Sequence, residues 1–572
     1  MHACLRVPDI LHCIIGFSKD DRNSDHPDTS YKDVARLART CKAFKDPALD
    51  ALWRKQSSLS PLVMCLPNRF WTRGNRSQNP VLRWLRWGSS RRDADRDKVK
   101  VVSLTMKPPP SLQDWLSLKR YSRRIQAFDS TPLDLPGICS NALHVFQPGL
   151  FPELFPSLRT LNFDVFNREP SYVRPIWLLT PMRLPHLVHL AFTICEHHQY
   201  QDPNEILQLP LACAPSLQTL RIDAVFDVNR RITPVHLAAS FRETPYLRIL
   251  SLSRNLDVSS NLREMIYLQN LQELTVTLPD DFDIDVHPSM QPILPSLRYL
   301  DVTVGSLNQG TNFLSFISSE LGHVKISHRL PAIWSDIYQL FQAIYRIYRR
   351  FPDFHTLIVE YSDTIALSTD PSFDLPRWIL KPLLACRRLR VFDLTSRGML
   401  GINDAFIAQI ALAWPDLETF HLRGSQRKLS RVTLRGLREL LRSCPRLLSL
   451  GMEVDTRVLP EEEPEMETLS LQSLHITTIG REGVHIRVAQ YLRVLAPRLQ
   501  VLCIESVRPD LGWAWAGNVL CDQPSPRPTQ PMVAFHLLLL SKESYRPLLP
   551  LPDGPRCAGC LWMEPCFSSL PW

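Results

Sequence analysis

Glycine is scarce in this chain, with 19 residues among 572, and glycine-rich phosphate-binding loops are absent. Neither G-x-x-x-x-G-K-[ST] nor G-x-G-x-x-G occurs, and these are the runs whose backbone N–H groups cradle the phosphates of nucleotides. The G-x-S-x-G and H-E-x-x-H motifs of serine hydrolases and zinc peptidases are missing as well. The sequence therefore offers no familiar motif for nucleotide-dependent or hydrolytic chemistry.

Long apolar runs are also lacking. No stretch approaches the roughly 18 consecutive apolar residues that indicate a membrane-spanning helix, and the leucine run at 537–540 is far too short. The N-terminus carries no apolar segment of the secretory type. The 14 cysteines stand mostly alone in apolar surroundings, which is typical of reduced thiols in the cytosol or nucleus. We therefore expect a cytoplasmic or nuclear protein that does not contact a membrane.

The cysteines and histidines do not form a complete set of metal ligands. Cys195 and His197 lack a second pair at ligand spacing, and Cys557, Cys560 and Cys566 supply only three thiolates. Incidental cysteines in an irregular tail are favoured over a zinc site. No metal and no cofactor is expected.

Charge of one sign is in small excess. The net charge of +9 and the isoelectric point near 8.9 are mild for 572 residues. A nucleic-acid-binding surface needs its positive charge gathered on one face. Segment 73–100 comes closest, because arginines and tryptophans are interleaved there, but Asp93, Asp95 and Asp97 reduce its positive charge. A solvated linker, or a cap on the structure that follows, is favoured over a nucleic-acid partner.

One six-residue phrase is repeated throughout the middle of the chain: Leu, two residues, Leu or Phe, one residue, apolar. Successive copies begin about 24 to 35 residues apart, a spacing typical of repeat arrays. A weaker copy, Leu321-Val324-Ile326, lies in the one long gap. The twelve strong copies begin at Leu158, Leu187, Leu217, Leu247, Leu271, Leu297, Phe354, Leu389, Leu417, Leu447, Leu471 and Leu499. An array of this length predicts a binding surface, because each repeat buries its apolar face only on its neighbours.

Many copies follow an amphipathic segment and a proline-containing corner, such as Trp414-Pro415 or Cys444-Pro445. Proline ends a helix and sets a reversal of the chain. Helix, corner and short strand in repetition predict parallel strands inside and helices outside. The predicted helices are 261–268, 334–350, 378–385, 404–414, 434–443 and 484–495.

The first 55 residues differ from the array. Residues 7–15 and 34–41 predict two short helices, and Asp46-Pro47 predicts the start of a third, because Asp is a good N-cap and Pro suits the first turn. Three such helices form a small bundle. Segment 111–128 predicts one longer helix, with Trp115, Leu118 and Ile125 at helical spacing.

Two family resemblances rest on these residues. The repeat phrase resembles the leucine-rich-repeat family in its longer, helix-bearing form. The N-terminus resembles an F-box, with Val-Pro-Asp-Ile-Leu at 7–11, Leu-Ala-Arg-Thr-Cys-Lys-Ala-Phe at 37–44 and Leu-Trp-Arg at 52–54. The combination looks like F-box/leucine-rich-repeat proteins of mushroom-forming fungi. It implies an F-box at 1–57, a linker and N-terminal cap at 58–139, a horseshoe-shaped solenoid at 140–507 and an irregular Pro-rich tail at 508–572.

The resemblance implies the substrate-recognition subunit of an SCF-type (cullin-RING) ubiquitin ligase, which has no covalent chemistry of its own. The F-box would dock on the adaptor subunit, and through it on the cullin, while the array would bind a target protein. Two alternatives stay open: a leucine-rich-repeat scaffold without a ligase role, and a nucleic-acid-associated protein that uses the basic segment 73–100. The positions that would face the adaptor are Pro8, Ile10, Leu11, Ile14, Leu37, Cys41 and Phe44. Several of these side chains could equally fill the core of the bundle.

The alternation of each strand predicts which side chains face the concave side of the array. If the second Leu and the apolar residue two positions later point inward, the residues between and beside them point to the concave face. Acids outnumber bases at these positions, so the partner is predicted to present a basic surface; acids that merely solvate the face are the other interpretation. The predicted substrate-binding acids are Asp164, Asp223, Asp301, Glu360, Asp393 and Glu453.

Overall fold

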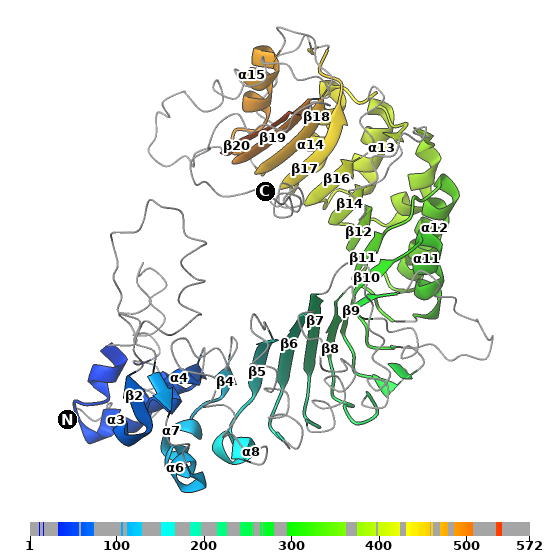
Figure 1. Ribbon diagram of the computed structural model, residues 1–572. Helices are drawn as coiled ribbons and strands as arrows, with labels where there is room; N and C mark the ends of the chain where they lie inside the picture. The colour runs from blue at the N-terminus through cyan, green and yellow to red at the C-terminus, as the bar shows by residue number, and fades with distance from the viewer. Residues whose placement is uncertain are drawn as a thin grey trace, which may run out of the picture. The chain divides into compact units, whose positions relative to one another are not determined.

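The chain is described here from a computed structural model, in which it forms two compact units, residues 1–277 and 278–572 (Figure 1). Each unit contains a parallel β-sheet. The residues that the structure describes are 11, 15, 33–56, 59–73, 104–106, 111–128, 150–165, 184–195, 214–225, 241–253, 256, 264–265, 267–278, 294–317, 319–361, 374–395, 399–423, 431–457, 459–460, 470–478, 485–506 and 534–539.

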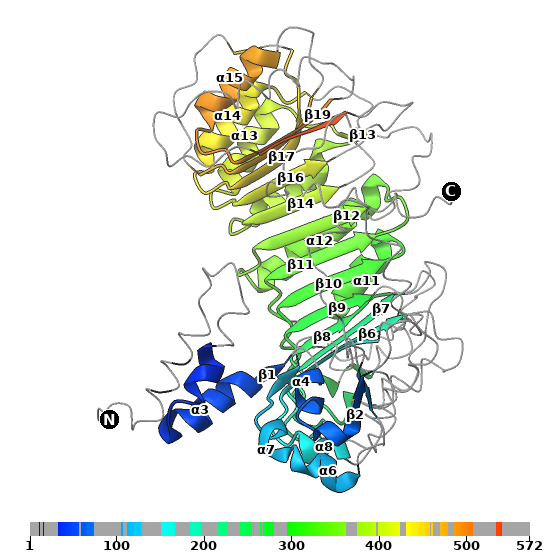
Figure 2. The same ribbon diagram turned by 60° about the vertical axis from the view of Figure 1, so that its left-hand side comes forward.

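The strands of the first unit follow one another across the sheet in almost the order of the sequence. Each pairs in parallel with the next, and β6 to β9 are seen side by side in Figure 2. From the edge inward they are β1 (Lys55–Gln56), β4 (Ala127–Phe128), β5 (Thr160–Val165), β6 (His189–Cys195), β7 (Thr219–Val225), β8 (Ile249–Leu252) and β9 (Glu273–Thr277). The edge strand β1 thus comes from the segment directly after the N-terminal bundle.

The second unit continues the same pattern of parallel strands. All of its neighbouring strands pair in parallel and in register. They are β10 (Tyr299–Val304), β11 (His323–His328), β12 (Thr356–Tyr361), β14 (Val391–Thr395), β16 (Thr419–Arg423), β17 (Ser449–Val454), β18 (Ser473–Thr478), β19 (Val501–Ser506) and β20 (Ala534–Leu539). Two short strands, β13 (Asp374–Leu375) and β15 (Met399–Leu400), pair separately.

Helices of the second unit pack on one face of its sheet. Gly310 of α11 lies against the apolar side chains of Val304 and Ile326, where an added Cβ would be 3.3 Å from Ile326 Cγ2. Neighbouring helices pack on each other, as α11 and α12 do in Figure 1. The helices are α11 (Leu307–Phe316), α12 (Trp334–Arg350), η8 (Arg377–Ala385), α13 (Asp404–Ala413), α14 (Leu434–Ser443) and α15 (His485–Leu495). We call the opposite side of the sheet of the second unit the open face.

The repeat phrase forms its core as the leucine spacing predicts. At β10, for example, Leu297, Leu300 and Val302 are fully buried. The corner before most of the described strands is a tight turn, in which the first Leu of the phrase donates its N–H to the carbonyl three residues earlier, as Leu417 does to Trp414 at 3.2 Å. Proline fits this turn because its fixed φ suits the second position. The prediction of a leucine-rich-repeat solenoid of parallel strands and outer helices is therefore confirmed.

The N-terminal bundle is described in part. Leu11 and Ile15 are helical and buried, and Ile15 packs with Val34 and Ala48 in a small core. The third helix, α3, spans Lys42–Trp53 with Cys41 at its N-cap, so the predicted start at Asp46-Pro47 is wrong. The Asp46 carboxylate binds Arg124 instead of capping the helix.

Three further expectations need correction. Segment 111–128 is two short helices, α6 (Leu112–Ser117) and α7 (Lys119–Ser122), followed by β4, because Gln126 and Ala127 donate their N–H groups to the carbonyl of Arg54. Residues 377–385 form a 3-10 helix with Pro382 inside it, and proline cannot donate the hydrogen bond that an α-helix needs there. The range 508–572 contains the strand β20, although an irregular tail was predicted. The domain boundaries stay predictions.

Among the described residues, no helix is both long and apolar enough to cross a membrane.

Candidate protein-binding faces

The predicted adaptor-facing residues that the structure describes lie in or beside the core of the bundle. Leu11 is 4% exposed, and Leu37 and Phe44 are half-buried against the Ile15 core. Cys41 is half-buried at the N-cap of α3. Part of the apolar surface of these side chains is thus used by the bundle itself. Pro8, Ile10 and Ile14 lie outside the described residues.

Helix α3 is fixed to the first strands of the sheet. Arg124, whose side chain is 12% exposed, donates to Asp46 at 2.6 Å and also to Asp50. The rings of Trp53 and Tyr121 stack with their centroids 5.0 Å apart. Two ion pairs, an aromatic stack and the strand that follows hold the bundle in one orientation on β1 and β4.

Polar side chains form rows across the open face of the second unit. On β10, β11 and β16 the two core positions are buried and the positions before and between them are partly exposed, as in Tyr299–Val302. The alternation of core and open-face residues predicted from the sequence is therefore correct at these positions. At such positions on β12, β14 and β17, Thr356, Asp393 and Gly451 are themselves buried. Because the strands pair in register, equivalent positions lie next to one another. The middle row contains Asp301, Lys325, Ile358, Asp393, His421, Gly451 and His475.

Glu360, one of the predicted acids, is paired within the face. Lys325 Nζ lies 2.9 Å from its carboxylate, and both side chains are about four-fifths buried, with exposed fractions of 19% and 22%. The Ser327 hydroxyl donates to the same carboxylate at 3.4 Å. Lys325 is a cation that the sequence reasoning missed, because it lies on the weak copy of the repeat phrase. Reading position 325 by the same parity would have found it.

Asp393 is likewise paired. Its Oδ2 lies 2.9 Å from Nδ1 of His421 and 3.0 Å from a guanidinium nitrogen of Arg423, and the Asp393 side chain is 13% exposed. Nε2 of His421 lies 2.9 Å from the Ser449 hydroxyl. Gly451 makes room for this histidine, because an added Cβ would be 2.9 Å from its Cδ2. A carboxylate, an imidazole and a hydroxyl thus form a hydrogen-bonded series across three strands.

The series Asp393, His421 and Ser449 has the order of groups found in serine hydrolases, but its surroundings differ. Such enzymes need N–H donors aimed at the oxygen that becomes negative. Here the N–H groups of Leu448 and Ser449 donate to the carbonyl of Glu418, at 2.8 and 3.1 Å. Both N–H groups beside the Ser449 hydroxyl are therefore used by the sheet, and neither is left for such an oxygen.

The remaining predicted acids have different environments. Asp223 of the first unit is exposed, and Asp301 and Glu453 of the second are half-buried. Nothing is described for the side chain of Asp164. With Glu360 and Asp393 neutralised in place, the acidic excess that the sequence predicted for the face is reduced.

His323 and Tyr299 begin the row next to the middle row. Their rings stack with centroids 4.1 Å apart. Burial, followed by the nearby charges of His355 and Lys325, lowers the pKa of His323 to about 4. The imidazole is therefore neutral near pH 7 and presents a flat, uncharged surface.

The described cysteines and histidines hold no metal cluster. No group of three His, Cys, Asp or Glu side chains suitable for a metal is present in the described ranges. Burial raises the pKa of the Cys386 and Cys444 thiols to about 12, so both are inert core residues. Cys557, Cys560, Cys566 and His197 lie outside the described residues.

No protein-family model and no curated protein matches this chain. Solved leucine-rich-repeat structures resemble its fold. A crystal structure of a TLR13–ssRNA13 complex matches over 74% of this chain and 66% of that chain, with 14% identity and a TM-score of 0.36. An internalin (inlF) from Listeria monocytogenes matches over 62% and 88%, with 13% identity and a TM-score of 0.32. The Rad7–Elc1 complex in yeast matches over 63% and 82%, with 16% identity and a TM-score of 0.32.

Proposed function

We propose that this chain is the substrate-recognition subunit of an SCF-type ubiquitin ligase, with an F-box that docks on the adaptor and a repeat array that binds a target protein. The observation that carries the proposal is the connection between bundle and array. An F-box-like sequence packs around Ile15, Val34 and Ala48, and its last helix leads directly into the edge strand of a repeat sheet. Such a connection supports the delivery of a bound target in one orientation.

The role proposed is binding, without covalent chemistry. Extended polar faces built from repeats suit a protein partner, because each strand adds further side chains to the same surface. The N–H groups beside Ser449 are already bonded, which supports a structural role for its hydroxyl.

The test is co-purification with the SCF adaptor and cullin. The tagged full chain should retain both, and Pro8→Ala combined with Ile10→Ala should abolish retention, because it removes apolar contact area from the predicted adaptor-binding edge. Leu412→Ala combined with Leu448→Ala is the matched control, since these leucines are 79% and 40% exposed in the second unit. Hydrogen exchange of the α3 amides checks that the bundle of the first variant stays folded.

The alternative is a repeat scaffold without a ligase role. It is favoured by the partial burial of Leu37 and Phe44 in the core of the bundle, which leaves less apolar surface for an adaptor. Failure of the wild-type chain to retain the adaptor would decide for the scaffold.

A further inference from the structure

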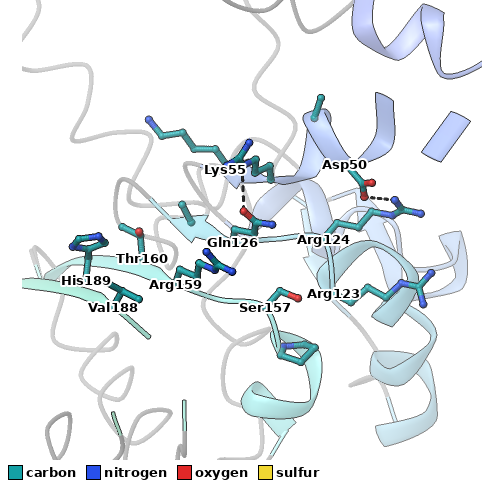
Figure 3. Close-up of a pocket in the computed structure, with 14 residues that line it drawn as sticks. Asp50, Lys55, Arg123, Arg124, Gln126, Ser157, Arg159, Thr160, Val188 and His189 are labelled. Atoms are coloured by element: carbon teal, nitrogen blue, oxygen red, sulfur yellow. Dashed lines mark hydrogen bonds and ion pairs between the residues drawn. The ribbon is translucent and has the colours of Figure 1, made fainter. Parts of the chain in front are cut away.

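A large open cleft lies in the first unit, where α3 meets the beginnings of β4, β5 and β6 (Figure 3). Its volume is about 1320 Å³, which exceeds the roughly 300–1,000 Å³ of most small-molecule sites. It is lined by Asp50, Ala51, Arg54, Lys55, Arg123, Arg124, Gln126, Ala127, Pro156, Ser157, Arg159, Thr160, Val188 and His189.

The lining of the cleft is strongly cationic. The lining contains four arginines and one lysine but a single carboxylate, that of Asp50. This carboxylate binds Arg124, which also binds Asp46. Asp50 and Arg124 thus form an ion pair, which is the dashed line between them in Figure 3.

Three arginines remain directed to solvent. Arg54, Arg123 and Arg159 are all exposed, and among the described residues no carboxylate pairs with them. Arg54 donates from Nε to the Gln126 side chain at 3.1 Å, which steadies its stem and leaves the two terminal nitrogens for a ligand. A planar guanidinium binds carboxylates and phosphates through two parallel hydrogen bonds. Neighbouring hydroxyls of Ser157 and Thr160 add neutral donors.

The lining also distinguishes between classes of anionic partner. Surfaces that bind single-stranded nucleic acid combine positive charge with Phe, Tyr or Trp rings on which bases stack. None of these three residue types is among the described residues that line the cleft. Clustered arginines without such rings are typical of sites for acidic or phosphorylated peptides.

We propose that this cleft binds an acidic segment of a partner protein, whose carboxylate or phosphate oxygens are held by Arg54, Arg123 and Arg159. In the proposed function that partner is the target, so the biological role of the cleft rests on that function, whereas its chemistry does not. The proposal assigns the anionic part of recognition to the first unit.

The test is fluorescence anisotropy with labelled peptides of equal length and spacing: one rich in Glu, one with phosphoserine at the same positions and one with Gln. The full chain should bind one or both anionic peptides and not the Gln peptide. Which of the two binds more tightly identifies carboxylate or phosphate as the natural anion. Arg123→Gln combined with Arg159→Gln should weaken binding about tenfold or more, because two charge-assisted contacts are lost.

The repeat itself supplies a matched control. Arg248 and Arg298 stand directly before β8 and β10, as Arg159 stands before β5, and both are exposed outside the cleft. Arg248→Gln combined with Arg298→Gln removes the same charge and should leave peptide affinity unchanged. Equal losses in both double variants would overturn the proposal, because they would show a general charge effect.

Two other results would also overturn it: no binding of either anionic peptide, or tighter binding of a single-stranded RNA probe with the same dependence on Arg123 and Arg159. Adaptor retention by the Arg123→Gln/Arg159→Gln variant separates this test from the proposed function. Retained adaptor with lost peptide binding is the expected result. If the wild-type chain binds the acidic peptide but no adaptor, the proposed ligase role is contradicted and the proposed peptide-binding site is supported.

Discussion

The cleft of the first unit and the open face of the second treat charge in opposite ways. On the open face, the carboxylates of Glu360 and Asp393 contact Lys325 and Arg423 of neighbouring strands at 2.9 and 3.0 Å. In the cleft, the exposed guanidinium groups of Arg123 and Arg159 have no carboxylate partner among the described residues. The open face thus pairs its charges within the sheet, whereas the cleft leaves its arginines available for a ligand.

The difference shows that the balance of acids and bases on a repeat surface does not identify its partner. Side chains that neutralise one another, such as Lys325 and Glu360, are distant in the sequence and adjacent only through strand register. A face that counts as acidic can therefore be nearly neutral, while a mildly basic chain can hold a concentrated cationic site.

The largest expected effect comes from breaking the pairing on the open face. Asp393→Asn leaves His421 and Arg423 without their carboxylate and should cost about 2 kcal/mol of unfolding free energy, or a few degrees in the midpoint of the calorimetric transition. The variant should also gain affinity for the Glu-rich peptide, because Arg423 becomes available. Asp416→Asn is the control: Asp416 pairs with Arg446 at 3.1 Å, but its side chain is 48% exposed, so little loss is expected.

The next effect concerns the ion pair between Asp50 and Arg124 in the cleft. Arg124→Gln removes both ion pairs with α3 and should cost about 1–2 kcal/mol, because the guanidinium is largely buried. Faster hydrogen exchange of the α3 amides is the expected signature. Arg123→Gln, one residue earlier and exposed, should leave that exchange unchanged; similar exchange in both variants would contradict the anchoring role of Arg124.

A smaller effect depends on pH. The pKa of His323 is about 4 in the folded chain and about 6.5 in an unfolded one, so between these values only the unfolded chain takes up the proton. Stability is thus fully present above about pH 6.5 and declines toward about pH 4. His323→Phe keeps the stack with Tyr299 and should recover about 1 kcal/mol of the loss between about pH 7 and about pH 5, a value discounted for partial exposure. Parallel profiles of variant and wild type in thermal denaturation would exclude His323 as the cause.

The smallest effect comes from Lys325→Met. The stem of the side chain keeps its packing and the ion pair with Glu360 is lost. Because Ser327 still donates to the carboxylate, a cost of just under about 1 kcal/mol is expected. The more informative measurement is binding: the uncovered carboxylate should give the open face a measurable affinity for a Lys-rich peptide. Lys381→Met, at an exposed lysine of η8, should produce no such affinity.

The strands and their buried positions could be read from the sequence because the repeat phrase combines a fixed spacing with a single requirement, burial on both neighbours. Helices 334–350 and 434–443 were likewise predictable, since their apolar stripes extend over whole turns. The start of α3 could not be, because Asp46 binds Arg124 from a segment 78 residues away instead of capping the nearest helix.

The sites were less predictable than the fold. Parity placed Glu360 and Asp393 on the right side of the sheet but could not show their partners. The cleft was missed entirely, because its arginines come from α3, the end of α7 and the residue before β5, and no local pattern links these positions. The prediction of one helix over 111–128 is wrong for a related reason. Residues 127 and 128 pair with the sheet, and this pairing outweighs the helical spacing of the apolar residues.

The edge strand β1 has a consequence for biosynthesis. Lys55 and Gln56 leave the ribosome well before Ala127 and Phe128, the residues with which they pair. During that interval the residues after α3 have no strand partner, and the pairing that joins the bundle to the sheet can form only once β4 has been made. A chain shortened to begin after residue 57 would leave β4 without its β1 partner, and its sheet would have an unpaired edge, the kind of surface on which chains aggregate.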